Sequence, residues 1–165
     1  MPSNTLIALP LNRDDFAPFG DVLDMDGDAP RPMNKGRASR YHALATPEVL
    51  GEGADVVISI AESEPVSGPL ECVMVERHPD GSQAFMPLTE HRTLIVVCPD
   101  EGGRPGTPRA FVSAPGQGVN YHRNIWHGVL SPLDVCQSYL IVDRSGPGNN
   151  LEEHYFEAPW RISIR

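Results

Sequence analysis

The sequence predicts an all-β fold, a β-barrel or jelly roll with few short helices. Seventeen prolines and fifteen glycines divide the 165 residues into short segments, which disfavours long helices and favours short strands with tight turns. Several apolar runs have the length of strands and are separated by turn signals at short spacing. The chain shows no internal repeat, linker or low-complexity block, so we expect one domain over residues 1–165.

The first half of the chain predicts two strands on either side of a loop. Residues 5–11 are typical of an edge strand that ends at a proline. Residues 12–20 predict a short helical turn with Asn12 as its N-cap and Gly20 as its end. Residues 24–36 are rich in Pro, Gly and Asp without periodicity, which indicates a loop. A clear strand follows over residues 54–61.

Residues 70–78 form the most informative predicted strand. By two-residue alternation, one face is shared by Leu70, Cys72, Met74, Glu76 and His78. This face begins apolar and ends with a carboxylate and an imidazole. We therefore expect it to point inward and to open onto a polar cavity near its end.

The second half of the chain predicts four further strands. Residues 93–98 are a continuous apolar run, consistent with a strand covered on both sides. Short strands are expected over residues 109–113 and 119–122, on either side of a Pro/Gly turn. Residues 133–143 are the last long strand, and the tail over 159–165 is compatible with one more.

Composition excludes several classes of protein. Hydrophobic residues make up 40% and charged residues 21%, as in ordinary globular domains. The net charge of −9 argues against a nucleic-acid partner, which requires a basic patch. The apolar runs are far shorter than the roughly 20 residues of a membrane helix, and the start lacks a signal peptide's basic region. We therefore expect a cytoplasmic protein with no membrane segment, in which the three cysteines, Cys72, Cys98 and Cys136, are buried free thiols.

Two histidine segments carry the candidate chemistry. Glu76, His78 and Gln83 lie within eight residues, and His122 and His127 lie within six. A cupin metal site combines ligands that alternate on one strand, a later Glu or Gln, and a histidine from a second segment; such ligands suit Ni, Fe, Mn or Zn. The spacing fits equally well a set of hydrogen-bonded barrel histidines without a metal.

Two strings make the resemblance to a known family specific. Glu-Arg-His-Pro-x-Gly-Ser-Gln-Ala-Phe over residues 76–85 and Gln-Gly-Val-Asn-Tyr-His-Arg-Asn-Ile-Trp-His over residues 117–127 resemble the signatures of ureidoglycolate lyases. Weaker matches lie at residues 16–22, Asn34, 40–42 and 141–144, so the resemblance covers the chain from about residue 6 to residue 150. Residues 150–165 do not resemble the family clearly, and their role stays open.

The resemblance implies a cupin-fold homodimer that splits (S)-ureidoglycolate into glyoxylate and urea during allantoin and purine degradation, with Ni²⁺ as a stimulating cofactor. It implies a tentative metal set of His78, Gln83 and His127. The implied catalytic residues are Glu76, His78, His122 and His127. The implied substrate-binding residues are Asn34, Arg40, Arg77, Ser82, Gln83 and Asn120. His42 belongs to the same early segment as Asn34 and Arg40, which we expect to cover the mouth of the site. Gly128 departs from the family, because many members have a second histidine there.

The residue types suit cleavage of a carbinolamide. Such a substrate needs a base for its hydroxyl proton, an acid for the departing urea nitrogen, and a cation for its carboxylate. The histidines with Glu76 are the proton carriers, in an order that the sequence leaves open. Arg40 or Arg77 is the candidate cation, although simple alternation turns Arg77 away from Glu76.

Other functions remain open at this point. A non-catalytic cupin that binds a small acid, or a metal-dependent cupin oxygenase or isomerase, would use the same histidines. The nitrogen product, urea or ammonia with carbon dioxide, is also open.

Overall fold

The computed structural model describes residues 4–165. Thirteen strands are present in this part of the chain, with one α-helical turn and one 3₁₀ turn. Their bounds are β1 Thr5–Pro10, α1 Arg13–Phe16, β2 Gly20–Leu23, β3 Arg31–Met33, η1 Asn34–Gly36, β4 Ala38–Arg40, β5 Asp55–Ser63, β6 Glu71–Arg77, β7 Gln83–Pro87, β8 Leu94–Cys98, β9 Arg109–Val112, β10 Gly118–Tyr121, β11 Trp126–His127, β12 Gln137–Ser145 and β13 Glu152–Ile164. The predicted all-β class with few short helices is confirmed.

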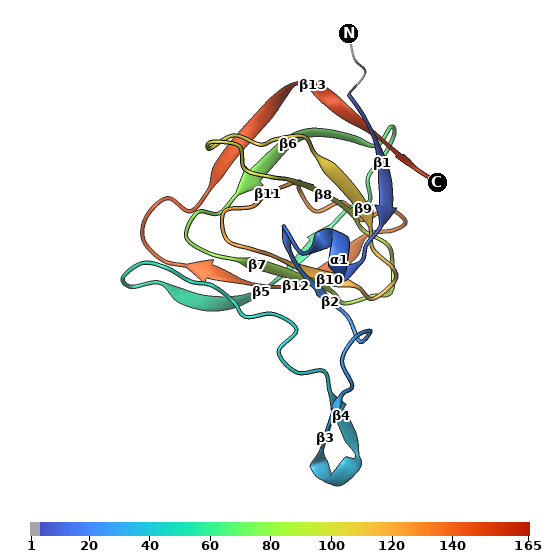
Figure 1. Cartoon of the computed structure of the whole chain (residues 1–165), viewed down its shortest axis with the longest axis vertical. Helices are drawn as coiled ribbons and strands as arrows, with labels where there is room; N and C mark the ends of the chain where they lie inside the picture. The colour runs from blue at the N-terminus through green and yellow to red at the C-terminus, as the bar shows by residue number, and fades with distance from the viewer. Residues whose placement is uncertain (1–3) are drawn as a thin grey trace.

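Six strands close into a ring in the order β1-β13-β6-β11-β8-β9 (Figure 1). A core cluster fills this ring and draws side chains from all six strands, including Ala8, Val75, Val96, Trp126 and Ile162. Strand β1 runs parallel to both β13 and β9 and so joins the two ends of the sheet. The prediction of an edge strand over residues 5–11 is therefore wrong, because the partner of β1 comes from the tail of the chain. The further strand predicted in that tail is confirmed as part of β13.

Five strands form a second sheet in the order β2-β10-β7-β12-β5. A second core cluster, which includes Phe16, Phe85, Val97, Phe111 and Tyr121, lies between this sheet and the ring. Strand β8 is buried along its whole length because its alternate residues enter the two clusters. The prediction that this strand is covered on both sides is confirmed.

Strand β6 does not keep the simple alternation that its sequence predicts. Cys72 and Val75 are three residues apart, yet both enter the core of the ring. The break in alternation coincides with a register shift in the pairing with β13, where the two-residue step from Cys72 to Met74 faces the five-residue step from Tyr155 to Trp160. Glu76 consequently faces away from the lumen of the ring, toward the second sheet.

Two local features near the N-terminus fix the path of the chain from α1 into β2. Asn12 caps α1 by accepting a hydrogen bond from the backbone of Asp15, as predicted. Gly20 begins β2 rather than ending the helix, and a Cβ there would lie 2.1 Å from the carbonyl oxygen of Asn120. Only glycine allows β2 to approach β10 so closely.

The segment predicted as a loop contains a hairpin. Strands β3 and β4 pair with each other alone and extend away from the body of the molecule, on the side of the second sheet (Figure 1). We call residues 31–40 the arm. Over residues 4–165 no helix is long and apolar enough to cross a membrane.

Candidate active site

Glu76, His78 and His127 form a compact cluster between the ring and the second sheet. Glu76 and His127 are directly paired across β6 and β11, and His78 follows the end of β6. One ligand atom from each of the three residues lies within 4.8 Å of the others. Tyr121, from the second sheet, stacks on the His127 ring with centroids 4.1 Å apart. The cluster therefore lies between the two layers, outside the lumen of the ring.

Both histidines are held with one nitrogen facing the cluster. Nδ1 of His78 lies 2.8 Å from the carbonyl oxygen of Asn150, and Nδ1 of His127 lies 3.0 Å from that of Gly128. Since a carbonyl oxygen only accepts, each Nδ1 carries the hydrogen. The two Nε2 atoms are buried and have no hydrogen-bond partner in the described residues. This is the arrangement of metal-binding histidines, whose second nitrogen is fixed by a backbone carbonyl.

Charge and burial set the two imidazoles apart. Burial lowers the pKa of His127 to about 4, so this ring is neutral near pH 7. Burial also opposes the charge of His78, but the facing Glu76 carboxylate, helped by the Asn150 carbonyl and the charge of Asp143, outweighs it and raises the pKa of His78. Its Nε2 lies 3.6 Å from Oε1 of Glu76, which is an ion pair rather than a hydrogen bond, and this contact lowers the pKa of the Glu76 carboxyl. The cluster thus contains a neutral imidazole, His127, beside an ion pair in which His78 favours the positive charge and Glu76 the negative charge.

Gln83 adds a further unpaired oxygen. Its amide nitrogen donates to Asp143 over 3.0 Å, and its buried Oε1 has no hydrogen-bond partner in the described residues. Gln83 is the register partner of Tyr121, which places it on the sheet beside the ring that stacks on His127. Asp143, Tyr121 and Asn150 also contribute to the site, although their sequence patterns had not marked them as site residues. Asp143 and Tyr121 lie inside the strings that resemble the family, and an acid at the end of an apolar strand was a signal for the first of them.

The structure does not bring His122 and Asn120 into this cluster. Both side chains contact Oδ2 of Asp21, at 3.1 Å and 2.9 Å respectively. Tyr121 lies between them in the sequence and faces the opposite side of the strand. Ser82 is likewise engaged elsewhere, because its hydroxyl accepts the backbone N–H of Glu48 over 2.7 Å.

The arginines proposed for the substrate carboxylate also lie apart from the cluster. Arg77 faces the other side of β6, where it pairs with Asp100 and Glu152 and lies 4.5 Å over the Trp126 ring. Arg40 and Asn34 are exposed residues of the arm, and His42 follows it. In a single chain, the predicted cover of the site therefore points away from it.

The donor set suits a divalent transition metal. The two free imidazole nitrogens, the Glu76 carboxylate and the free oxygen of Gln83 are N and O ligands of the kind that nickel, iron or zinc accepts. Unpartnered polar atoms in a buried site are costly unless something binds them. The residues present therefore fit a bound metal ion, whose identity the ligand types leave open.

The family model of ureidoglycolate lyase matches residues 3–163. The chain belongs to the ureidoglycolate lyase family. It is 57% identical over 159 residues to the ureidoglycolate lyase of Chelativorans sp. (strain BNC1), which covers 96% of each chain. The corresponding protein of Mesorhizobium japonicum is 55% identical over 96% of this chain and 98% of its own length. Ureidoglycolate lyase 2 of Rhizobium meliloti is 51% identical over 93% of this chain and 94% of its own length.

The departure at Gly128 falls outside the cluster. A Cβ at this position would lie 3.4 Å from Cβ of Val96, a member of the core of the ring. A side chain here would point into the ring, away from His127. The absence of the second histidine that many members of the ureidoglycolate lyase family have leaves the cluster intact.

Proposed function

We propose that the protein cleaves (S)-ureidoglycolate into glyoxylate and urea at the cluster of Glu76, His78 and His127. The observation that carries the proposal is the pair of buried Nε2 atoms without partners, held beside a carboxylate in a member of this family. Polar atoms left unsatisfied at such a position are available for a substrate or a metal.

The proton transfers follow from the charge states of the cluster. The neutral Nε2 of His127 accepts the hydroxyl proton of the substrate. The carbon–nitrogen bond then breaks, the hydroxyl carbon becomes the aldehyde of glyoxylate, and the electron pair leaves with the urea nitrogen. His78, whose pKa is raised through Glu76, donates the proton that this nitrogen requires. The proton lost and the proton gained balance, so the reaction needs no oxidant or reductant.

We propose that a bound Ni²⁺ would be held by Nε2 of His78, Nε2 of His127 and Oε1 of Gln83. Because an imidazole nitrogen that binds a metal carries no proton, Glu76 would then be the proton carrier of the cluster. A bound divalent ion would lower the pKa of the substrate hydroxyl and neutralise charge on its oxygens. Gln83 is oriented for this role, because Asp143 fixes its amide nitrogen and leaves Oε1 free.

We further propose that the protein acts as a cytoplasmic homodimer in purine degradation. The resemblance to the ureidoglycolate lyase family supports this setting. The exposed apolar side chains of β5, described below, support a contact between two copies.

The test is to incubate the purified protein with racemic ureidoglycolate and to measure glyoxylate, urea and ammonia separately, with and without added Ni²⁺. We expect glyoxylate and urea in equal amounts, and half of the racemate consumed. Glyoxylate at only the spontaneous rate would contradict the proposal, and ammonia in place of urea would assign a hydrolase. Metal analysis of the protein as isolated tests the cofactor independently.

A further inference from the structure

The arm is a cationic element that contacts little of its own protomer. Its two strands pair with each other and with no other strand. It contains four of the 13 lysines and arginines of the chain and none of the 22 acidic residues. All four cations are exposed, and none makes a side-chain hydrogen bond or ion pair within residues 4–165. These cations are Arg31, Lys35, Arg37 and Arg40.

Two of these cations face each other. Arg31 and Arg40 are direct register partners across β3 and β4. Like charges in such a position destabilise a strand pair unless an anion lies between or near them. The charge of Arg31, with that of Arg40, also lowers the pKa of the neighbouring His42. The arm is therefore built to receive a negative charge that its own protomer does not place there.

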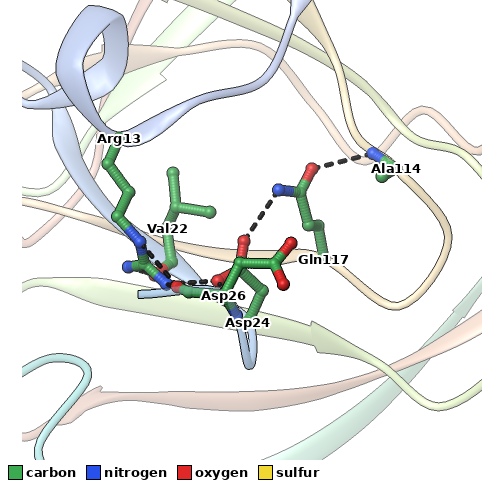
Figure 2. A network of polar contacts seen from close by, with 6 residues as sticks. All are labelled: Arg13, Val22, Asp24, Asp26, Ala114 and Gln117. Atoms are coloured by element: carbon green, nitrogen blue, oxygen red, sulfur yellow. Dashed lines mark hydrogen bonds and ion pairs between the residues drawn. The ribbon is translucent and has the colours of Figure 1, made fainter. Parts of the chain in front are cut away.

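The base of the arm is anchored to the body. Arg13 donates to the carbonyl oxygens of Val22 and Asp26 and pairs with Asp24. Gln117 donates to Asp24 over 2.8 Å and accepts the backbone N–H of Ala114, which joins the same segment to the turn before β10 (Figure 2). The arm thus leaves the body from a fixed point, on the side of the second sheet (Figure 1).

The outer face of the second sheet is apolar along its edge strand β5. Val56, Ile58 and Ile60 alternate along β5 with side chains that are 51%, 71% and 67% exposed. They point away from the core between the layers, and their partners on β12 include Leu140 and Val142. A contiguous exposed apolar surface of this kind marks a protein contact. A second copy would bury it by presenting the same face, as two-fold symmetry allows.

The substrate carboxylate needs a cationic partner, and the arginines near the site in the same protomer already have other partners. The substrate of the proposed function carries a carboxylate. In the described chain, each arginine around the site already has partners: Arg77 binds Asp100 and Glu152, Arg123 donates to the Pro79 carbonyl, and Arg144 donates to the carbonyls of Leu50 and Pro147. Six lysines and arginines of the described chain have no side-chain hydrogen bond or ion pair, and four of them lie on the arm. The other two are Arg104, in the loop after β8, and Arg165, after β13.

We propose that two copies pack through the exposed face of the second sheet and that the arm of each enters the active site of the other, where its cations hold the substrate carboxylate. This inference rests on the proposed function for the identity of the anion. Charge complementarity supports the second copy as the occupant. The arm carries four positive charges, whereas the rest of the chain carries all 22 acidic residues and only nine lysines and arginines. Arg40 and Asn34, which the family resemblance assigns to the substrate, then act in trans.

The decisive experiment is complementation between two inactive variants. One carries Ser in place of the four arm cations, and the other carries His78→Ala with an intact arm. The two are co-expressed with different tags, and the heterodimer is isolated. Each homodimer should lose about 10²-fold in kcat/KM. The heterodimer should recover about half of the wild-type rate, because one of its two sites has both an intact cluster and an intact arm.

Arg104→Ser is the matched control, since Arg104 is also an exposed arginine but lies outside the arm. It should leave the rate unchanged. A heterodimer as inactive as both homodimers would overturn the proposal, because the arm would then serve its own site. A fully active arm variant, or a fully active wild-type monomer, would overturn it as well.

Sedimentation separates this proposal from the proposed function. The wild type should sediment as a dimer, Ile58→Asp should dissociate it, and the arm variant should weaken it. If the wild type fails to cleave ureidoglycolate but shows this pattern, the proposed function fails and the arm contact stands. If it cleaves ureidoglycolate but neither variant changes its association, only the contact between copies is refuted.

Discussion

Glu76 and Arg77 are neighbours on β6, and they build two polar clusters of opposite character. Around Arg77 every charge has a partner: Asp100, Glu152 and the Trp126 ring surround the guanidinium, and the Trp126 N–H donates to Asp100 over 2.9 Å. Around Glu76, both Nε2 atoms of the histidines lack a hydrogen-bond partner in the described chain. The first cluster is complete in the folded protein. The second retains buried polar atoms without hydrogen-bond partners, which is why the proposed function places the metal and the substrate there.

Replacing a histidine of the Glu76 cluster should have the largest effect. His127→Ala and His78→Ala should each lower kcat by at least about 10²-fold, because each removes a proton carrier or a ligand. Arg77→Ala should keep nearly the wild-type kcat, since its partners are structural. Steady-state kinetics of glyoxylate release measures all three. Near-wild-type rates for both histidine variants would refute the site.

His122→Ala sharpens the same comparison. Its partner Asp21 lies outside the cluster, so we expect a loss of kcat well below about 10²-fold. A loss equal to that of His127→Ala would show that His122 takes part in proton transfer despite its separate position.

Arg77→Ala should be the variant that loses most stability. It removes two ion pairs and the cation–π contact while leaving Asp100 and Glu152 without a cation. We expect about 1–3 kcal/mol of destabilisation by urea unfolding. His78→Ala should cost less, because it removes one hydrogen bond to the Asn150 carbonyl and one longer ion pair with Glu76. The reverse order would contradict the division between the two clusters.

Gln83→Glu tests why the chain has an amide where cupins commonly use a carboxylate. The new carboxylate would face Asp143, which now accepts the amide hydrogen of Gln83 over 3.0 Å. We expect a metal-free stability loss of about 1–3 kcal/mol from the lost bond and the like-charge contact. Adding Asp143→Asn should restore most of it. An unchanged midpoint in the single variant would show that the amide is not required by Asp143.

The smallest expected effect is a change in how stability depends on pH, measured with a chelator present. The pKa of His127 is about 4 in the folded chain against an ordinary 6.5. Between these values the unfolded chain binds more protons, so stability falls as pH falls. His127→Gln should flatten this dependence. His78, with its raised pKa, acts in the opposite direction above pH 6.5: its stabilisation is present below that pH and is lost as pH rises through the raised value. An unchanged pH profile in His127→Gln would contradict the buried neutral ring.

The sequence predicted the class of fold and most strands, because apolar runs and turn residues are local signals. It could not supply the partner of β1, which lies at the other end of the chain. It also missed the arm, whose residues are polar and whose turn depends on the left-handed backbone of Asn34 and Lys35, with φ of 51° and 57°.

The candidate site shows the same limit. Glu76, His78 and His127 were predicted together and lie together, because the first string begins on β6 and the second ends on β11, which pairs with β6. Arg77 and His122 were implied by the family resemblance, but Arg77 points to the opposite face of β6 from Glu76, and His122 contacts Asp21 instead of the cluster. The face that Glu76 occupies was also mistaken, since the register shift in β13 cannot be detected from β6 alone.

The parallel pairing of β1 with β13 has a consequence for how the protein is made. Residues 5–8 hydrogen-bond to a strand that includes residues 161–164. The first strand to leave the ribosome therefore cannot form this pairing until the last strand has been synthesised. The ring can close only after synthesis is nearly complete, and contacts of such long sequence separation form slowly. A chain shortened by even the final strand segment would leave β1 with an open edge that invites aggregation. Joining the two ends and opening the chain at an exposed turn should instead give a permuted protein that closes its ring early.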